Sequence, residues 1–410
     1  MSTMNNIHND ELTNLPNRFA LIEYLESVDY ANVLLIDIDN FSNVNNAYGF
    51  EYGDVVLKEM ARLLDVAKPS SAKLFRINSD EFVVVCLEVM SSKNLSSLAS
   101  SMISFFDQME ISISDDIDFR VSISIGIAMG KGSDIVNHAK IAIKELREHR
   151  RGFFRIYDPN SIYMKKQKEN IYWIHKIKEA FEEESLVAYY QPIVNNKTKK
   201  IEKYECLVRI YDEGILIPPI RFMEASKLTG TLSLVTKAVI EQSFEKFSDT
   251  DYDFSINITN TDLYLNYLQE YLLKYAKKYN INPSRVILEM LEDIDSISTT
   301  EILAQLNSLR YHGFKIAIDD FGSESSNFSR LLEFSPDYLK IDGSFIKNIL
   351  TDSNSLTIVE VIILLSRKSN MKVIAEYVHS AEVQAKVEEL GIEYSQGYYF
   401  GEPKPELISL

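Results

Sequence analysis

The stretch FKIAIDDFG (residues 314–322) decides the fold of the second half of the chain, because an apolar run passes directly into two acids. The run FKIAI predicts a buried β-strand. Asp319 and Asp320 follow at its end, where an ionised carboxylate without a partner would be costly. The two acids therefore indicate a strand end that opens onto a functional site.

Six more short apolar strands are expected in the same half, at residues 187–194, 201–210, 252–259, 286–291, 338–342 and 371–376. Helices fit between them, for example at residues 301–311 and 355–367. This alternation of strands and helices predicts a parallel α/β sheet or barrel.

Nearly every one of these strands carries a polar or charged residue near its end. The set comprises Glu205, Asn257, Glu289, Asp319, Asp320, Lys340 and Glu376. In a (β/α)8 barrel the carboxyl ends of the strands converge on one open face. Carboxylates gathered there would repel one another unless cations neutralise them, and oxygen ligands favour Mg, Mn or Ca. The pair Asp319-Asp320 is suited to bridging two ions.

Each acid taken alone could equally be a helix cap or a loop residue, and only the whole set with one lysine argues for a site. A two-metal site activates a water and stabilises the attacking and leaving oxygens of phosphoester cleavage. Lys340 could neutralise developing charge or orient the water. The residues alone thus predict a metal-dependent phosphodiester or phosphate-ester hydrolase on a barrel.

Length and composition limit the alternatives. A chain of 410 residues with 46% hydrophobic and 25% charged residues is globular and contains about two to three domains. Its formal net charge of −17 argues against binding nucleic acid through a broad basic face. Cys86 and Cys206 are too few for a disulfide framework. With no signal peptide and no apolar run long enough for a membrane span, we expect a cytoplasmic protein.

The first half predicts a separate α+β unit. Strands are expected at residues 33–39, 74–77, 82–89 and 119–129, the second and third forming a hairpin, and helices at residues 18–28, 54–66, 94–109 and 134–149. A linker helix at about 165–185 follows. We therefore divide the chain into domains at residues 1–160 and 161–410.

Several ordered motifs of the second half resemble those of EAL domains in the bacterial tandem GGDEF–EAL proteins of cyclic di-GMP signalling. The motifs are YQPI (190–193), ECLVR (205–209), SINIT (255–259), EMLE (289–292), DDFG (319–322), KID (340–342) and QGY (396–398). The resemblance implies a modified (β/α)8 TIM barrel that opens cyclic di-GMP to pGpG.

The resemblance also assigns residues by position. Two ions, Mg2+ or Mn2+, would be held by Glu205, Asn257, Glu289, Asp319, Asp320 and Glu376. The catalytic groups would be Lys340, which contacts the water, with Glu205 and Glu376. Substrate contacts would come from Gln191, Leu207, Arg209 and Gln396, and Glu292 would order the loop after Asp320. A homodimer through the EAL domain is a further implication.

Three departures from the family pattern leave an alternative open. Cys206 replaces the alanine of the EAL motif, Glu324 replaces a loop glycine, and Tyr377 and His379 replace a glycine and an acid. A glycine that needs a positive φ is not cheaply replaced. The alternative is a non-catalytic cyclic di-GMP receptor that signals through conformation or a partner.

The first half resembles a GGDEF domain, the diguanylate cyclase fold, through ELTNLPNR (11–18) and IDIDNFSNVNNAYGFEYGD (36–54). By position Asp37 would bind metal, Asn45 and Asp54 would contact guanine, and Asp80 survives in the signature. The signature itself reads NSDEF (78–82), and its serine places a side chain where phosphate should lie. We therefore expect little or no cyclase activity, and either a GTP-binding regulator or a scaffold.

Overall fold

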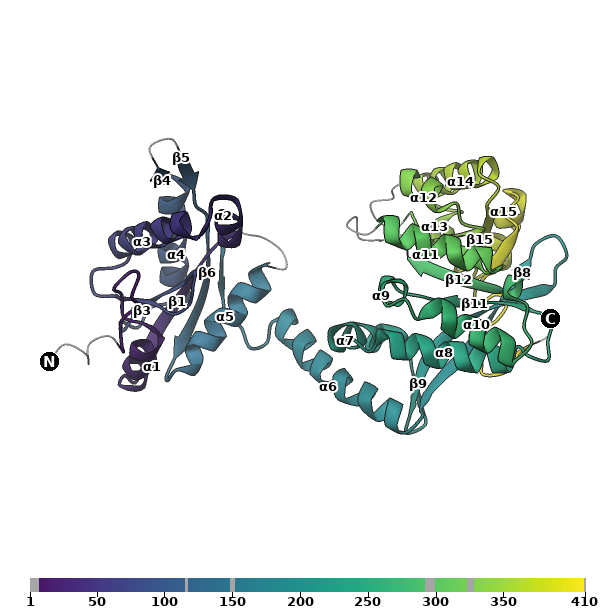
Figure 1. Cartoon of the computed structure of the whole chain (residues 1–410), viewed down its shortest axis with the longest axis horizontal. Helices are drawn as coiled ribbons and strands as arrows, with labels where there is room; N and C mark the ends of the chain where they lie inside the picture. Colours follow the sequence, from purple (N-terminus) through teal and green to yellow (C-terminus); the bar gives the residue numbers. More distant parts are fainter. Residues whose placement is uncertain (1–6, 115–116, 148–151, 292–298, 323–327, 409–410) are drawn as a thin grey trace. The chain divides into compact units, whose positions relative to one another are not determined.

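The computed structural model describes residues 7–114, 117–147, 152–291, 299–322 and 328–408. The chain divides into two compact units, Met1–Gln167 and Lys168–Leu410. The boundary lies within helix α6 (Ile162–Glu182). Figure 1 shows the two units, each built around its own β-sheet.

The first unit has a five-stranded sheet in the order β2-β3-β1-β6-β7. Its strands are β1 (Ala31–Ile38), β2 (Lys73–Arg76), β3 (Glu81–Cys86), β6 (Ile123–Gly130) and β7 (Phe154–Ile156). Its helices are α1 (Arg18–Glu26), α2 (Phe41–Tyr48), α3 (Phe50–Ala67), α4 (Ser92–Asp107) and α5 (Asp134–Arg147).

The central strand β1 is buried along its whole length because both faces of this sheet are covered. Leu34 and Ile36 belong to one apolar core, which includes residues of α3 and α4, whereas Val33 and Leu35 belong to a second one, which includes residues of α1 and α5. Alternate residues of a strand point to opposite faces. An unbroken apolar run is therefore what this position requires.

The prediction of a single strand at residues 119–129 is wrong. The chain forms β5 (Ile117–Arg120), which pairs with β4 (Glu110–Ser114) in a separate two-stranded sheet, and then β6. The alternation of apolar residues runs on through residues 121–127, so it cannot show that the two segments have different partners.

The second unit is a closed barrel of eight strands, in the order β9-β11-β12-β13-β14-β15-β16-β8 and back to β9. The strands are β8 (Leu186–Asn195), β9 (Ile201–Asp212), β11 (Asp253–Asn257), β12 (Val286–Leu291), β13 (Lys315–Phe321), β14 (Tyr338–Ile341), β15 (Lys372–Ala375) and β16 (Tyr394–Gln396). The short strand β10 (Ile215–Ile217) extends β9 as a hairpin.

One strand of the barrel departs from a fully parallel arrangement. β8 is antiparallel to both of its neighbours, β9 and β16, whereas the seven other strands run parallel to one another. The barrel is thus the modified form of the (β/α)8 fold.

Helices follow most strands and cover the barrel. They are α7 (Met223–Thr229), α8 (Leu232–Lys246), α9 (Asn260–Tyr264), α10 (Leu268–Lys278), α11 (Thr299–Tyr311), α12 (Phe328–Phe334), α13 (Gly343–Asn348), α14 (Ser353–Lys368) and α15 (Ala381–Glu389), with 3-10 turns η1 (Pro219–Arg221) and η2 (Pro283–Arg285). Among the described helices, none has both the length and the apolar character that crossing a bilayer requires.

The barrel interior is built in layers. An apolar layer comprises Ile193, Ile287, Ala317, Tyr338, Ile374 and Tyr394. Side chains two residues apart on a strand share a face. The next layer toward the carboxyl ends therefore contains the residue two positions further along each parallel strand, and two positions earlier on the reversed strand β8.

Candidate active site

That next layer of the barrel is the polar set singled out in the sequence. Counting two positions from the apolar layer leads to Gln191, Glu289, Asp319, Lys340, Glu376 and Gln396. Glu205 and Asn257 complete it, because Gln191 is paired with Glu205 across β8 and β9, and Asn257 with Glu289 across β11 and β12. The polar side chains thus gather because they lie next to the apolar layer on the inward face of their strands.

Lys340 lies at the centre of this layer. Its Nζ is 2.8 Å from Glu289 Oε2, 2.8 Å from Glu376 Oε1, 3.0 Å from Asp319 Oδ1 and 3.3 Å from Glu205 Oε2. The side chain is fully buried. Because a buried ammonium needs compensating charge, the four carboxylates explain how an apolar strand accommodates this lysine.

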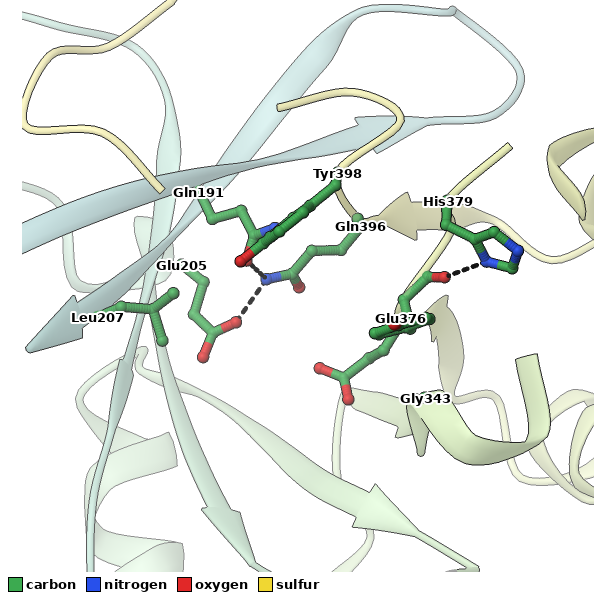
Figure 2. Close-up of a pocket in the computed structure, with 10 residues that line it drawn as sticks. Gln191, Glu205, Leu207, Gly343, Glu376, His379, Gln396 and Tyr398 are labelled. Atoms are coloured by element: carbon green, nitrogen blue, oxygen red, sulfur yellow. Dashed lines mark hydrogen bonds between the residues drawn. The ribbon is translucent and has the colours of Figure 1, made fainter. Parts of the chain in front are cut away.

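Amide groups hold Glu205 from its other side. Gln396 Nε2 donates to Glu205 Oε2 at 2.6 Å, and Asn257 Nδ2 donates to Glu205 Oε1 at 2.8 Å. Gln396 Nε2 also lies 3.1 Å from Gln191 Oε1, and Gln191 Nε2 donates to the carbonyl of Gly401 at 3.2 Å. Figure 2 shows this chain of amides behind the Glu205 carboxylate.

Charge crowding shifts the acidity of these groups in different directions. Burial favours the neutral acid, yet Lys340 and the two amides hold the pKa of Glu205 below its usual value. Burial, together with Glu205 and Asp319, raises the pKa of Glu289 to about 8. Burial also raises the pKa values of Asp319 and Glu376.

Lys340 itself stays charged. Burial acts to lower its pKa, but Asp319, Glu205, Glu289 and Glu376 together raise it well above the usual value. A lysine held protonated in this way donates hydrogen bonds and stabilises negative charge, and it does not accept a proton.

The carboxylates fit hard divalent cations. Glu205, Glu289 and Asp319 each offer an oxygen within 4.8 Å of the others, and so do Asp319, Asp320 and Glu376. Asp319 belongs to both groups. Glu289 Oε1 is buried and has no hydrogen-bond partner within the described ranges, so this oxygen could coordinate an ion. Oxygen donors in this number are those that Mg2+, Mn2+ and Ca2+ prefer.

Asp320 has a left-handed backbone, with φ of 52°, at the point where β13 reaches the site. Burial, followed by Asp319 and Asp342, raises its pKa to about 6. Non-glycine residues held in this conformation cluster at functional sites, and here the turn brings two successive carboxylates to the same group.

A cavity of about 470 Å³ opens beside the carboxylates. Its lining comprises Gln191, Glu205, Leu207, Gly343, Glu376, Tyr377, His379, Gln396, Gly397 and Tyr398. In Figure 2 the carboxylates of Glu205 and Glu376 point into the same space from two sides. Three of the four expected substrate contacts, Gln191, Leu207 and Gln396, therefore lie on its wall.

The remaining expected residues are placed differently. Arg209 does not line this cavity, and its Nη1 donates to the carbonyl of Val208 at 2.8 Å. Burial lowers the pKa of its guanidinium. Glu292 and the altered loop at residues 323–327 lie outside the described residues.

Several lining residues were missing from the expected site. Gly343, Tyr377, His379, Gly397 and Tyr398 line the cavity but had no assigned role. For Gly397 the signal was available, since QGY is one of the quoted motifs. A β-carbon at this glycine would lie 2.1 Å from the carbonyl oxygen of Val378, so the backbone approach requires glycine.

In the first unit, the expected nucleotide residues are close to basic side chains. Asp37 is buried on β1 and forms an ion pair with Arg147, and Glu81 pairs with Lys140 at 2.6 Å. Burial raises the pKa of Asp37 to about 6 against the effect of Arg147. Asp80 and Arg147 line a cavity of about 230 Å³.

The two expected guanine contacts lie on neighbouring helices outside that cavity lining. Asn45 is on α2 and Asp54, an exposed residue, is on α3. Asn45 Oδ1 is buried without a hydrogen-bond partner among the described residues. A β-carbon at Gly53 would lie 2.0 Å from this oxygen, so the glycine makes room for the amide.

The altered signature forms an ordinary turn between β2 and β3. Asn78 and Ser79, both described, keep negative φ values where the family has two glycines. Ser79 Oγ donates to Asp80 Oδ1 at 2.9 Å, and Asn78 donates to Glu81. The turn thus ties its own acids to its own polar side chains.

Comparison with known proteins agrees with this architecture. The family description "EAL domain" matches residues 174–403, and "Diguanylate cyclase, GGDEF domain" matches residues 7–152. Cyclic di-GMP phosphodiesterase PdeB of Shewanella oneidensis is 28% identical over 97% of this chain and 48% of that protein. Bifunctional diguanylate cyclase/cyclic di-GMP phosphodiesterase MucR of Pseudomonas aeruginosa is 28% identical over 97% of this chain and 60% of that protein.

A solved structure described as "PaMucR Phosphodiesterase, c-di-GMP complex" superposes with a TM-score of 0.54 at 28% identity, covering 57% of this chain and 97% of that one. The chain spans about half the length of PdeB, the first of these relatives. Because the EAL description covers more than half of the chain and a GGDEF domain precedes it, the chain belongs to the tandem GGDEF–EAL family.

Proposed function

We propose that the barrel is a metal-dependent phosphodiesterase that hydrolyses cyclic di-GMP to pGpG. The observation that carries this proposal is the presence of two sets of three acidic residues that have Asp319 in common. These acids lie around Lys340 and beside an open cavity. The choice of substrate is supported by the names of PdeB and MucR, and by the similar PaMucR structure described as a c-di-GMP complex.

Glu205, Glu289 and Asp319 would hold one ion, and Asp319, Asp320 and Glu376 a second, with Asn257 beside the first; Mg2+ and Mn2+ suit these oxygens. Bound there, the ions would activate a water and stabilise both oxygens of an in-line displacement at phosphorus.

The chain's own residues supply orientation and fixed charge. Lys340 stays protonated, so its ammonium lies ready to stabilise negative charge as the phosphodiester is attacked. Lys340, with the amides of Gln396 and Asn257, keeps the Glu205 carboxylate ionised against the effect of burial, and the two amides fix its direction. Gln191 and Leu207 present one polar and one apolar contact on the cavity wall.

For the first unit we propose a regulatory or scaffolding role without cyclase activity. Asp37 is engaged by Arg147, and Glu81 by Lys140, so both carboxylates already have cationic partners. The side chains of Asn78 and Ser79 occupy the turn that two glycines form in the family. GTP, if it acts, would bind through Asn45 and Asp54.

The deciding experiment is a turnover assay on the purified chain with Mg2+ or Mn2+, with and without GTP, followed by chromatography of the products. Accumulation of pGpG supports the phosphodiesterase, and a change on adding GTP supports the regulatory role. Formation of cyclic di-GMP from GTP would refute the inactive cyclase.

A second function is favoured by one observation. Lys340 contacts four carboxylates and so compensates part of their charge before any metal ion binds. A non-catalytic cyclic di-GMP receptor would show tight binding of the dinucleotide and no pGpG in the same assay.

A further inference from the structure

Tyr377 lies in a backbone conformation that disfavours it. Its φ is 56°, in the left-handed region, directly after Glu376 of the active site. Glycine adopts this conformation freely, whereas a residue with a β-carbon does so at a cost. Strained residues persist when the surroundings fix them, and they concentrate at functional sites.

The surroundings that fix Tyr377 are specific. A β-carbon at Gly343 would lie only 2.8 Å from Tyr377 Cβ, so the glycine at the start of α13 makes room for the tyrosine. On the other side, the rings of Tyr377 and His379 are 5.7 Å apart between centroids. Lys347 Nζ lies 5.6 Å from the centre of the tyrosine ring.

The ring is nevertheless not part of the core. Tyr377 is 52% exposed and lines the same cavity as Glu205 and Glu376. Tyr398, 67% exposed, is a second aromatic residue of that cavity. The strain lies in the backbone of Tyr377, and its half-exposed ring makes only part of the contacts that a buried ring would make. A ligand in the cavity would supply further contacts to the exposed ring.

We propose that Tyr377 is a positioning residue whose ring forms an aromatic wall beside Glu376, against which one base of the dinucleotide stacks. The inference rests on the proposed function, because the base is that of cyclic di-GMP. Stacking on an aromatic side chain is sequence-tolerant and strengthens binding of each base considerably. The ring acts on binding and placement of the substrate, while the carboxylates and Lys340 act on phosphorus.

Two substitutions remove the ring and suit the backbone, Tyr377→Gly and Tyr377→Asn, and Tyr377→Phe keeps the ring without the hydroxyl. Asn370→Gly is the matched control, because Asn370 also has a positive φ, of 56°. Asn370 lies before β15, whereas Glu376 and the active site lie after it. The affinity for cyclic di-GMP is measured by calorimetry on the full chain, in EDTA and again with Ca2+. Melting temperature, kcat, KM and the Mn2+ activation constant are measured alongside.

The ring-less variants should bind cyclic di-GMP about tenfold more weakly or worse. Their KM should rise in parallel while kcat and the Mn2+ activation constant stay close to the parent values. Their melting temperature should not fall, since the backbone strain is relieved. Tyr377→Phe and Asn370→Gly should bind as the parent does.

Unchanged binding of cyclic di-GMP by Tyr377→Gly and Tyr377→Asn overturns the inference. Tighter binding overturns it as well, because it would show that the ring obstructs the cavity. Loss of affinity in Tyr377→Phe equal to that in Tyr377→Gly overturns it as well, because the hydroxyl would then be responsible. A parent chain that neither binds nor hydrolyses cyclic di-GMP refutes the proposed function and the inference with it, whereas normal binding by the parent and the ring-less variants refutes the inference alone.

Discussion

Lys340 Nζ donates to Glu289 Oε2 at 2.8 Å, and neither side chain is accessible to solvent. The pair joins strands β14 and β12 across the interior of the barrel. A buried ammonium thus serves as the common partner of carboxylates that would otherwise repel one another.

Replacing Lys340 with Met should abolish hydrolysis and destabilise the metal-free chain by about 3–5 kcal/mol, because four buried acids lose their cation. Added Mn2+ should recover part of the stability but none of the turnover. Urea unfolding with and without Mn2+ measures the first effect, and pGpG formation measures the second. Lys368→Met, at the exposed end of α14, is the control; full activity in Lys340→Met would remove the lysine from the active site.

The variant Glu205→Gln should lose hydrolysis by at least about a hundredfold, since a carboxylate ligand becomes a neutral amide. The fold should persist, because Gln keeps the size of the side chain. Initial rates of pGpG formation and Mn2+ titration test this expectation. Glu360→Gln, exposed on α14, should behave as the parent. Parent-like rates in Glu205→Gln would contradict the assignment.

Chelation should stop hydrolysis without unfolding the chain, because Lys340 holds the carboxylates when no ion is bound. Returning Mg2+ or Mn2+ should restore turnover. Saturating ion should also raise the free energy of unfolding, by about 2.7 kcal/mol at a concentration one hundred times the Kd. Circular dichroism in EDTA tests whether the chain stays folded, and the rate of pGpG formation after the ion is returned tests whether activity recovers. Turnover that persists in EDTA argues against a metal.

Asp37 should make the first unit less stable at alkaline pH. Burial raises its pKa to about 6, so the folded state binds the proton more tightly than the unfolded state does. Its penalty is fully present above pH 6 and disappears as the pH falls toward about 4, the unfolded value. Asp37→Asn should therefore stabilise the unit at pH 8, by no more than about 3 kcal/mol, and hardly at pH 4.

Hydrogen exchange of the β1 amides in EDTA, at the two pH values, reports this difference locally. Arg147 loses its ionic partner in the variant, but its side chain is 45% exposed and the loss should be small. Equal stabilisation at both pH values would show that charge on Asp37 is not the cause.

Binding of GTP, if the first unit has it, should depend on Asp54. The residue is exposed on α3, and a carboxylate there can accept hydrogen bonds from the guanine edge. Asp54→Ala should weaken GTP binding by about tenfold. Asp65→Ala, exposed on the same helix, should not. Calorimetry compares the two variants, and equal affinity in Asp54→Ala and the parent would refute this site.

Much of the barrel was readable from the sequence because its strands are short apolar runs that end in acids. All seven strands expected in the second half are present, and the polar residues from Glu205 to Glu376 do gather around Lys340. The reversal of β8 could not be predicted, since an apolar strand reads the same in either direction. Its Gln191 reaches the site only through that reversal.

Other features were hidden because they depend on tertiary partners. Residues 119–129 are divided between two sheets because β5 pairs with β4 and β6 pairs with β1. The alternation of apolar side chains does not indicate which strand each segment pairs with. The sequence predicts Lys340 near a strand end with a role in catalysis, but it does not show which side chains surround its ammonium group. That four acids share Lys340 depends on the closure of the barrel, which brings residues of separate strands together.

The placement of β8 between β9 and β16 also dictates when this protein can finish folding during its synthesis. β8 is the first strand of the barrel to leave the ribosome and β16 the last, yet the two are hydrogen-bonded neighbours. Gln396, which orients Glu205, emerges with β16. The GGDEF unit can thus fold while the barrel is still being translated, but the barrel cannot close until β16 has left the ribosome.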